Sequence, residues 1–339
     1  MEKILVIQTA FIGDAILTLP MIQVLKRMHP SSKIDVLSIP ATSELFTASP
    51  YVNNVIVIDK HGKHKRLFSM RNLINQIKTN NFSMLYSPHR SLRTALIVMQ
   101  SKIVETFGFS NSSFKHVFKY IVEYKHNKHE VQRNFDLIGF NYRAEEWKIL
   151  PEVDIPVETK KLVDDFFVDY ELTGKISAIA PGSVWNTKQY PHEYFEEVIK
   201  YLLHNDMKVL LIGGANESDL CKGIADKFNG KVISIAGKFS LLGSIEILKR
   251  TKLLISNDSA PTHLGMCSNI HVLTIYCSTV ADFGFYPYNN KSCYLSFDNL
   301  TCKPCGVHGY NECPRHTFEC GYKLTPDRVI FKIEEMLND

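Results

Sequence analysis

The sequence predicts an α/β protein made of two doubly wound halves, each with a parallel sheet between layers of helices. Short apolar runs alternate with segments whose apolar residues recur at helical spacing, which is typical of parallel sheets. The chain has 339 residues, which is long for one domain and suits two. The stretch PEVDIPVE at residues 151–158 carries two prolines between the two alternations, so it indicates a linker.

In the first half, the alternation is clear as far as residue 100. Apolar runs bounded by charged or turn residues predict buried strands at 4–7, 33–39, 55–58 and 84–86. Apolar residues at helical spacing predict helices at 15–28, 44–48, 67–78 and 91–100. Residues 110–150 are rich in Lys, His, Phe and Tyr and have poor periodicity, so they predict helices without clear bounds.

The same two patterns return in the second half. Strands are predicted at 176–180, 208–212, 232–235, 253–256 and 272–276. Helices are predicted at 159–167, 194–204, 217–228, 241–250, 260–267 and 326–337. We therefore expect domains at residues 1–155 and 156–325 and a C-terminal helix at 326–339. Doubly wound domains bind ligands outside the carboxyl ends of their strands, so a cleft between the two is the expected site.

Composition and charge narrow the class of protein. The chain is 45% hydrophobic and 22% charged, and no apolar stretch approaches the roughly 18 residues of a membrane helix. The apolar run at the N-terminus is too short for a signal peptide, so we expect a cytoplasmic protein. Residues 1–155 hold 20 Lys and Arg against 13 Asp and Glu (+7), and the remainder holds 19 against 22 (−3). The first half therefore suits an anionic acceptor, or simply has a solvated basic face.

The first strand runs into Gly13 and Asp14, where a helix begins. Glycine permits close approach of a ligand to the backbone. Asp14 is open to two interpretations: an N-cap of the helix, or a carboxylate that accepts a proton from a hydroxyl group of the substrate. The loop lacks the three glycines of a dinucleotide-binding fingerprint, which argues against NAD.

Three loops of the second half carry polar residues directly after predicted strands. Ser183, Thr187 and Lys188 suit a diphosphate, and Glu217 after two glycines suits a ribose. Asp258, Ser259 and His263 lie where a strand opens into a helix, whose N-terminus is a natural phosphate site. The alternatives are ordinary loops, a surface lysine, helix caps and a packed histidine.

Four cysteines cluster near the C-terminus within residues 302–320, at Cys302, Cys305, Cys313 and Cys320. In a cytosolic chain such a set more often binds a metal than forms disulfides, and four thiolates suit zinc or iron. The alternative is a set of reduced thiols in a glycine- and proline-rich loop. Either role is structural, since nothing places the cluster at the reacting atoms.

Four motifs, IGDAILTLP, PGS followed by TKQYP, GGANE and SNDSAPTHL, together resemble glycosyltransferase family 9, the heptosyltransferases. The resemblance covers nearly the whole chain and implies a GT-B fold with the donor held mainly by the second domain. It implies metal-independent, inverting transfer of heptose from ADP-heptose to an anionic lipopolysaccharide inner-core acceptor. This chain departs from many members of the family by Gln8, Ala10, Phe11 and Ala260.

The resemblance also implies roles for single residues. Asp14 corresponds to the general base, Lys188 to the lysine on the donor diphosphate and Glu217 to the acid near the ribose. Gly13, Ser183, Thr187, Asp258, Ser259 and His263 complete the expected donor site. Arg90 and Arg93 follow a strand of the first domain and suit an anionic acceptor, and residues 60–66 form a second basic run. The implied partners are a nucleotide sugar, a lipid-linked glycan and the surface of the inner membrane, where the protein would be peripheral.

Three alternatives remain open from the sequence. The enzyme could use another nucleotide sugar or a protein or capsule acceptor. The chain could bind a nucleotide sugar without catalysis, although the presence of Asp14 and Lys188 argues against this. Binding of nucleic acid is disfavoured, because the basic residues and the cysteines lie in different domains and no nucleic-acid module is recognisable.

Overall fold

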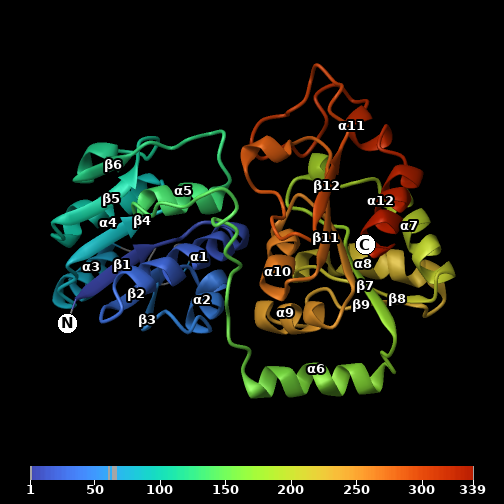
Figure 1. The fold of residues 1–339 in the computed structure, drawn as a ribbon, viewed down its shortest axis with the longest axis horizontal. Coiled ribbons are helices and arrows are strands. Elements are labelled where there is room, and N and C mark those ends of the chain that lie inside the picture. The colour runs from blue at the N-terminus through green and yellow to red at the C-terminus, as the bar shows by residue number, and fades with distance from the viewer. Residues whose placement is uncertain (1, 60–61, 63–66, 339) are drawn as a thin grey trace. The chain divides into compact units, whose positions relative to one another are not determined.

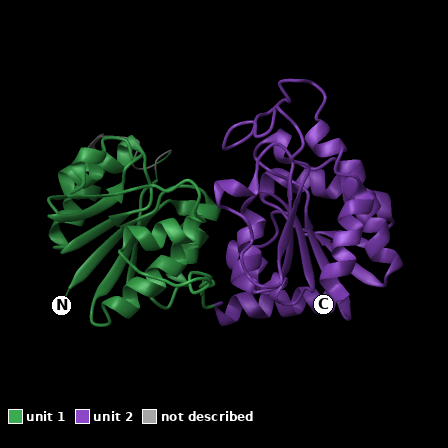
Figure 2. Ribbon diagram, turned by 45° about the horizontal axis from the view of Figure 1, so that its top comes forward, with its two compact units in different colours: residues 1–154 green, residues 155–339 purple. Residues whose placement is uncertain are grey.

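The computed structural model describes residues 2–59, 62 and 67–338. The chain divides into unit 1 (Met1–Asp154) and unit 2 (Ile155–Asp339), and the division falls inside the predicted linker (Figure 2). Within the described residues each unit has one six-stranded sheet, and every strand pair in both sheets is parallel. This confirms the predicted α/β class.

The described part of unit 1 has the strand order β3-β2-β1-β4-β5-β6 (Figure 1). Its strands are β1 (Lys3–Ile7), β2 (Lys33–Ser38), β3 (Asn54–Val57), β4 (Met84–Ser87), β5 (Glu105–Phe109) and β6 (Tyr120–Val122). Its helices are α1 (Ile12–Met28), α2 (Pro40–Thr47), α3 (Leu67–Thr79), α4 (Leu92–Ser101), the short 3-10 helix η2 (Lys115–Val117) and α5 (Glu130–Leu137).

β1 shows why the sequence folds this way. It pairs with β2 on one side and with β4 on the other, and residues 4–7 are fully buried. A parallel strand covered by helices on both faces is apolar along its buried length, and ILVI after Lys3 has this pattern. The poorly periodic segment contains β6, an edge strand of three residues with little buried surface, and the short helix α5.

The described part of unit 2 has the strand order β12-β11-β10-β7-β8-β9. Its strands are β7 (Lys175–Ala180), β8 (Met207–Leu211), β9 (Val232–Ser234), β10 (Leu253–Asn257), β11 (His271–Tyr276) and β12 (Cys293–Ser296). Its α-helices are α6 (Val157–Asp169), α7 (His192–His204), α8 (Ser218–Ala225), α9 (Leu241–Lys249), α10 (Ala260–Ser268), α11 (Glu319–Tyr322) and α12 (Pro326–Asn338). Its 3-10 helices are η3 (Asn186–Lys188), η4 (Ala215–Glu217), η5 (Asp226–Phe228) and η6 (Ala281–Phe283). β12 has no counterpart in the sequence prediction, because it is another short, partly exposed edge strand.

The C-terminal helix α12 completes the core of unit 2. Val329, Ile333 and Met336 recur at intervals of four and three residues, and all three are buried in the same core cluster as the central strands. The helix packs against α7 (Figure 1). Of the helices within residues 2–59 and 67–338, none is long and apolar enough to cross a membrane.

Numbered from the chain order of their own strands, both sheets have the order 3-2-1-4-5-6. In such a sheet the chain reverses its direction of winding between the first and the fourth strand, and a crevice opens there at the carboxyl ends. In unit 1 this point lies between β1 and β4, and in unit 2 it lies between β7 and β10. The loops and helix starts that follow these four strands carry most of the predicted site residues, whereas Glu217 follows β8 and the cysteine cluster follows β12.

Candidate active site

Asp14 lies in the first turn of α1 and is not its N-cap. The helix begins at Ile12, three residues earlier than predicted, so Phe11 is the N-cap residue and no side chain caps the helix there. The carboxyl group of Asp14 instead accepts hydrogen bonds from the backbone N–H groups of Phe11 and of Asp14 itself. The N-cap interpretation of Asp14 is therefore wrong.

The surroundings of Asp14 raise its pKa from 3.8 to about 7. Burial is the largest cause, and the negative charge of Glu130 acts in the same direction. The positive charge of Arg90 and the two backbone hydrogen bonds oppose the rise. A carboxyl group with a pKa near 7 is well matched to proton transfer at neutral pH, which is what a general base requires.

A buried network from α5 supports this part of unit 1. Glu130 and Arg133 form an ion pair of 2.9 Å and both are buried, and the hydroxyl of Tyr124 donates to Glu130 Oε2 at 2.9 Å. Arg133 also donates to the backbone oxygens of Lys125 and His126 at 2.8 and 2.7 Å. The ion pair is thus fully hydrogen-bonded, as a buried pair must be to be tolerated.

This network also fixes Arg90. The guanidinium of Arg90 stacks over the ring of Tyr124 at 4.2 Å, and that of Arg133 lies 4.6 Å from the same ring. Arg93 is exposed in the first turn of α4. The predicted basic run at residues 60–66 lies outside the described residues, apart from Gly62.

Two contacts shape the loop between β1 and α1. Gln8 is buried, and its side chain donates to Thr18 Oγ1 at 2.9 Å and accepts from the backbone N–H of Ala10 at 3.2 Å. Thr9 Oγ1 and His89 Nδ1 are 2.9 Å apart, which joins the carboxyl ends of β1 and β4. Gln8 therefore has a structural role in this chain.

In unit 2 the structure brings together three of the predicted donor residues. Lys188 Nζ is 2.6 Å from Asp258 Oδ2, and both side chains are largely buried. His263, in the first turns of α10, is buried, and burial lowers its pKa to about 4, so its ring is neutral. Its Nδ1 atom is buried without a hydrogen-bond partner. A buried polar atom left unpaired in a native fold calls for a bound ligand or water.

The loop of Ser183, Thr187 and Lys188 is anchored at both ends. Asn257, at the end of β10, accepts a hydrogen bond from the backbone N–H of Tyr190 at 2.9 Å and donates to the backbone oxygen of Pro181 at 2.8 Å. The backbone oxygen of Ser183 accepts a bond from Gln189. Ser259, the N-cap residue of α10, follows Asn257 by two positions, so this loop after β7 and the N-terminus of α10 lie close together.

Glu217 closes the loop after β8. Its Oε2 atom accepts a hydrogen bond from the backbone N–H of Gly214 at 2.7 Å. A Cβ atom at Gly182 would lie 2.1 Å from Glu217 Oε1, so only glycine permits this carboxylate to approach the loop after β7. The carboxylate is therefore held between the loop after β8 and the loop after β7.

The Cys-rich loop is tied to the same site. Thr187 Oγ1 donates to Ser278 Oγ at 3.0 Å and accepts from the backbone N–H of Tyr310 at 2.8 Å. The backbone N–H of Cys305 donates to the oxygen of Ser278 at 2.8 Å. Gly309 has φ +77°, and a Cβ atom there would lie 2.9 Å from Thr187 Oγ1. We call these contacts among Thr187, Ser278 and Tyr310 the donor-site junction.

The expected metal site at Cys302, Cys305, Cys313 and Cys320 is not supported. All four are free thiols, and within the described residues no group of three or more His, Cys, Asp or Glu side chains could hold a metal ion. Cys320 lies in α11 inside the hydrophobic core, where burial raises its pKa to about 11. The other three lie in the partly exposed loop before it.

Several residues of the site were not predicted. Thr279 Oγ1 donates to Asp258 Oδ2 at 2.7 Å, and Ser278 belongs to the donor-site junction. Both directly follow the predicted strand 272–276, so polar residues at the carboxyl end of that strand were an available signal. The buried network of Glu130, Arg133 and Tyr124 gave no such signal, because Glu130 and Arg133 look like solvated helix residues in the sequence.

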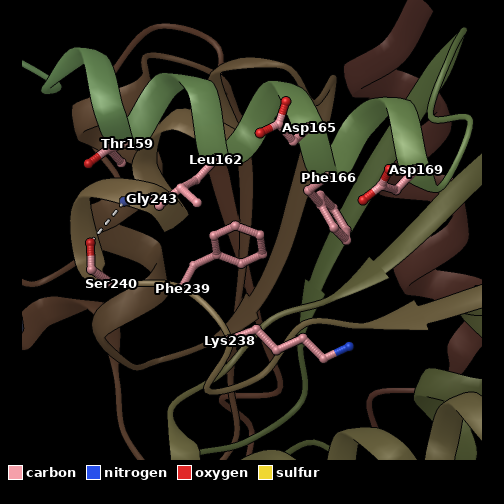
Figure 3. Close-up of a pocket in the computed structure, with 9 residues that line it drawn as sticks. All are labelled: Thr159, Leu162, Asp165, Phe166, Asp169, Lys238, Phe239, Ser240 and Gly243. Atoms are coloured by element: carbon pink, nitrogen blue, oxygen red, sulfur yellow. Dashed lines mark hydrogen bonds between the residues drawn. The ribbon is translucent and has the colours of Figure 1, made fainter.

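A pocket elsewhere in unit 2 lies between α6 and α9 (Figure 3). Leu162 and Phe166 point from α6 toward Phe239, and the two phenylalanine rings meet edge to face at 5.2 Å. None of its lining residues is a predicted site residue. In each unit, we therefore place the candidate functional residues at the carboxyl edge of that unit's own sheet.

Solved structures share this architecture. A glycosyl transferase family 9 protein from Veillonella parvula matches with a TM-score of 0.87 and 20% identity, over 99% of this chain and 97% of that one. The ADP-heptose lps heptosyltransferase II of E. coli matches with a TM-score of 0.79 and 18% identity, over 99% and 98%. The two parallel sheets and these matches define a GT-B fold, as the motifs implied.

The family follows from the sequence comparison. The family model for glycosyltransferase family 9 (heptosyltransferase) matches residues 70–314, more than half of the chain. The chain therefore belongs to this family and is a glycosyltransferase, which confirms the resemblance. It is also 22% identical to the lipooligosaccharide heptosyltransferase 2 of Campylobacter jejuni subsp. jejuni serotype O:6, over 98% of this chain and 99% of the relative.

Proposed function

We propose that this glycosyltransferase moves heptose from ADP-heptose to an anionic sugar of the lipopolysaccharide inner core, with inversion at the anomeric carbon. The observation that carries the proposal is the similarity, over nearly the whole chain, to relatives named as heptosyltransferases. The geometry of both carboxyl edges supports it, since one edge has a candidate base and the other has groups suited to a diphosphate.

In the proposed reaction Asp14 accepts the proton of the acceptor hydroxyl. The acceptor oxygen forms its bond to the anomeric carbon while the bond from that carbon to the diphosphate oxygen breaks. Direct displacement of this kind inverts the anomeric centre, and the electron pair leaves with ADP. Asp14 is suited to this step because its pKa of about 7 lets it hold and release a proton at neutral pH.

The leaving ADP needs its new charge stabilised, and unit 2 has the groups for this. An ammonium group has three N–H donors, so Lys188 can bind phosphate oxygens while it keeps Asp258 as a partner. The N-terminus of α10 beside Ser259 adds the positive end of the helix dipole. The buried Nδ1 of His263 is one further polar atom available to the donor. Because these groups suffice in principle, we propose that transfer needs no metal or other cofactor.

For the acceptor we propose Arg90 and Arg93. A guanidinium group binds a carboxylate or phosphate through two parallel hydrogen bonds, and inner-core sugars carry such groups. Arg90 is held over the Tyr124 ring and so keeps one direction. We further propose that the protein works on the cytoplasmic side of the inner membrane, because the acceptor is anchored in lipid.

The test is turnover with purified protein and an extracted Kdo–lipid A acceptor, with ADP-heptose offered beside ADP-glucose and GDP- and UDP-sugars. We expect consumption of ADP-heptose and formation of a product with inverted anomeric configuration, read by NMR. Consumption of a different nucleotide sugar would replace the donor assignment but keep the transferase. Binding of ADP-heptose without any turnover would contradict the proposal and leave a non-catalytic binder.

A further inference from the structure

One helix of unit 1 exposes an apolar face. Leu92, Leu96 and Met99 of α4 are 49%, 44% and 58% exposed. Positions four and three residues apart lie on the same side of a helix, so the three side chains form one stripe. Ile97 and Val98 lie on the other side and are buried against the sheet. The exposed stripe is therefore additional to the residues that hold α4 in place.

A further exposed apolar residue lies near the start of α4. Phe114 is 69% exposed and immediately precedes η2, which packs against α4. The backbone N–H of Ser113 donates to the oxygen of Arg90 at 3.0 Å, which fixes Phe114 beside the first turn of the helix. We call Leu92, Leu96, Met99 and Phe114 the α4 face.

The charges near the α4 face are positive. Arg93 and Lys102 are exposed at the two ends of α4, and Lys115 is half-buried next to Phe114. The helix itself contains no acidic residue. Glu105, just beyond its end, forms an ion pair with Lys119. An apolar helix face with basic flanks is the pattern of a segment that lies in the interface of an anionic membrane.

Two other helices show that this pattern is not general in the chain. The described exposed side chains of α3, which packs beside α4, are all polar: Arg71, Asn72, Asn75, Gln76 and Thr79. α6 of unit 2 exposes Val157, Leu162 and Val168, but its exposed carboxylates outnumber its two exposed lysines, Lys160 and Lys161. The carboxylates are those of Glu158, Asp164, Asp165 and Asp169. An anionic surface would repel α6, whereas it would attract α4.

We propose that the α4 face is the membrane-docking surface of this enzyme and that it inserts into a leaflet of anionic lipid. Leu92 follows Arg90 by two residues at the carboxyl edge of the sheet. Insertion would therefore hold Arg90 at the level of the lipid headgroups, where a lipid-linked acceptor carries its anionic sugars. The docking itself does not depend on the proposed function, but this role in acceptor delivery rests on it.

The test is sedimentation of the full chain with vesicles of phosphatidylethanolamine and phosphatidylglycerol, compared with vesicles of phosphatidylcholine. The variant L96S/M99S removes two exposed apolar side chains, and L162S/V168S on α6 is its matched control. We expect L96S/M99S to lose about tenfold or more in affinity for the anionic vesicles, since each side chain contributes buried apolar area. The control should bind like the wild type.

Two further measurements test the docking surface independently of vesicle sedimentation. Vesicle-bound wild type should show hydrogen-exchange protection confined to the segment that contains residues 92–101, which requires no variant. L96S/M99S should lose turnover on vesicle-embedded acceptor and keep it on the delipidated core oligosaccharide.

Unchanged vesicle binding by a natively folded L96S/M99S, or no protection of α4, would overturn the proposal. A wild-type dimer that dissociates in L96S/M99S would also overturn it and assign the α4 face to a second copy of the chain. If no donor is turned over but the vesicle results hold, the proposed function fails and the docking surface stands.

Discussion

The two units have the same strand order and different chemistry at the same place. At the carboxyl edge of unit 1, Asp14 has a pKa of about 7 and lies within electrostatic range of Arg90. At the carboxyl edge of unit 2, Lys188 and Asp258 form an ion pair near the neutral ring of His263. The topology determines where a ligand can bind, and the side chains after the strands determine what reaction is possible.

The units also differ in how their edges are held. The edge of unit 1 is supported by Glu130 and Arg133 of α5 together with Tyr124, which precedes this helix. The edge of unit 2 is supported by the donor-site junction, whose partner Tyr310 lies 123 residues after Thr187. The predictions below test whether proton transfer and donor binding divide between the units in the same way.

The largest effect is expected for Asp14→Asn. The amide is nearly the same size but cannot accept the proton, so kcat should fall by about 10²- to 10⁴-fold. Single-turnover kinetics with ADP-heptose would measure this fall in the rate of transfer. The dissociation constant of ADP should stay nearly unchanged, because the groups proposed to bind the diphosphate belong to unit 2, and a large loss of ADP affinity would contradict the division.

Lys188→Ala should mainly weaken ADP binding, whereas Asp14→Asn should mainly lower kcat. It removes the charge on the diphosphate and leaves Asp258 largely buried without its cation, so ADP affinity should fall about 10- to 100-fold. Isothermal titration calorimetry measures this. Lys238→Ala, which removes a lysine from the pocket of Figure 3, is the matched control and should bind ADP normally.

The rate should depend on pH through Asp14. Its folded-state pKa is raised, so the carboxyl group is protonated and inactive as a base below about pH 7. We expect kcat/KM to fall about tenfold per pH unit on the acid side of this value. His263 does not contribute to this limb, because its pKa is about 4 and it remains neutral throughout. A flat profile from pH 5 to 8, read in the pH-rate experiment, would exclude Asp14 as the base.

A smaller effect is expected at the donor-site junction. Thr187→Val keeps the shape of the side chain but leaves the N–H of Tyr310 and the hydroxyl of Ser278 without their partner, which should cost about 1–3 kcal/mol of stability. The KM for ADP-heptose should rise with little change in kcat. Thr18→Val in unit 1 removes a comparable buried hydroxyl bond to Gln8 and should leave this KM unchanged.

The smallest effect is expected from a chelator. The proposed reaction uses no metal ion at the carboxyl edge of either sheet. Dialysis against EDTA should therefore leave the initial rate unchanged. Loss of activity that zinc or iron restores would show that the Cys-rich loop binds a metal after all.

The sequence predicted the central strands and the positions of the site loops for a physical reason. Strands such as β1 and β10 are buried on both faces, so their apolar runs are continuous. Polar residues that follow such runs stand out, which is how Asp14, Lys188 and Asp258 were identified. The edge strands β6 and β12 have too few buried residues to produce a pattern.

Other features depended on contacts that periodicity does not encode. Arg133 is fully buried although its residue type is typical of the surface, because four hydrogen bonds satisfy its guanidinium group. The spacing of the four cysteines suggested a metal site, but spacing along a loop does not fix where thiols meet in space. The start of α1 was missed because Ile12 and Gly13 give no capping signal.

The donor-site junction has a consequence for the order in which the molecule is made. Synthesis runs from the N-terminus, so the sheet of unit 1 can be complete long before the partners of Thr187 and Tyr190 exist. The hydroxyl of Thr187 cannot bond to the backbone N–H of Tyr310 until residue 310 has been made. The hydroxyl of Tyr190 likewise donates to the backbone oxygen of Leu324 at 2.7 Å, and residue 324 is made later still. On the ribosome, the candidate base is therefore in place early, and the proposed nucleotide-sugar site is among the last parts of the enzyme to form.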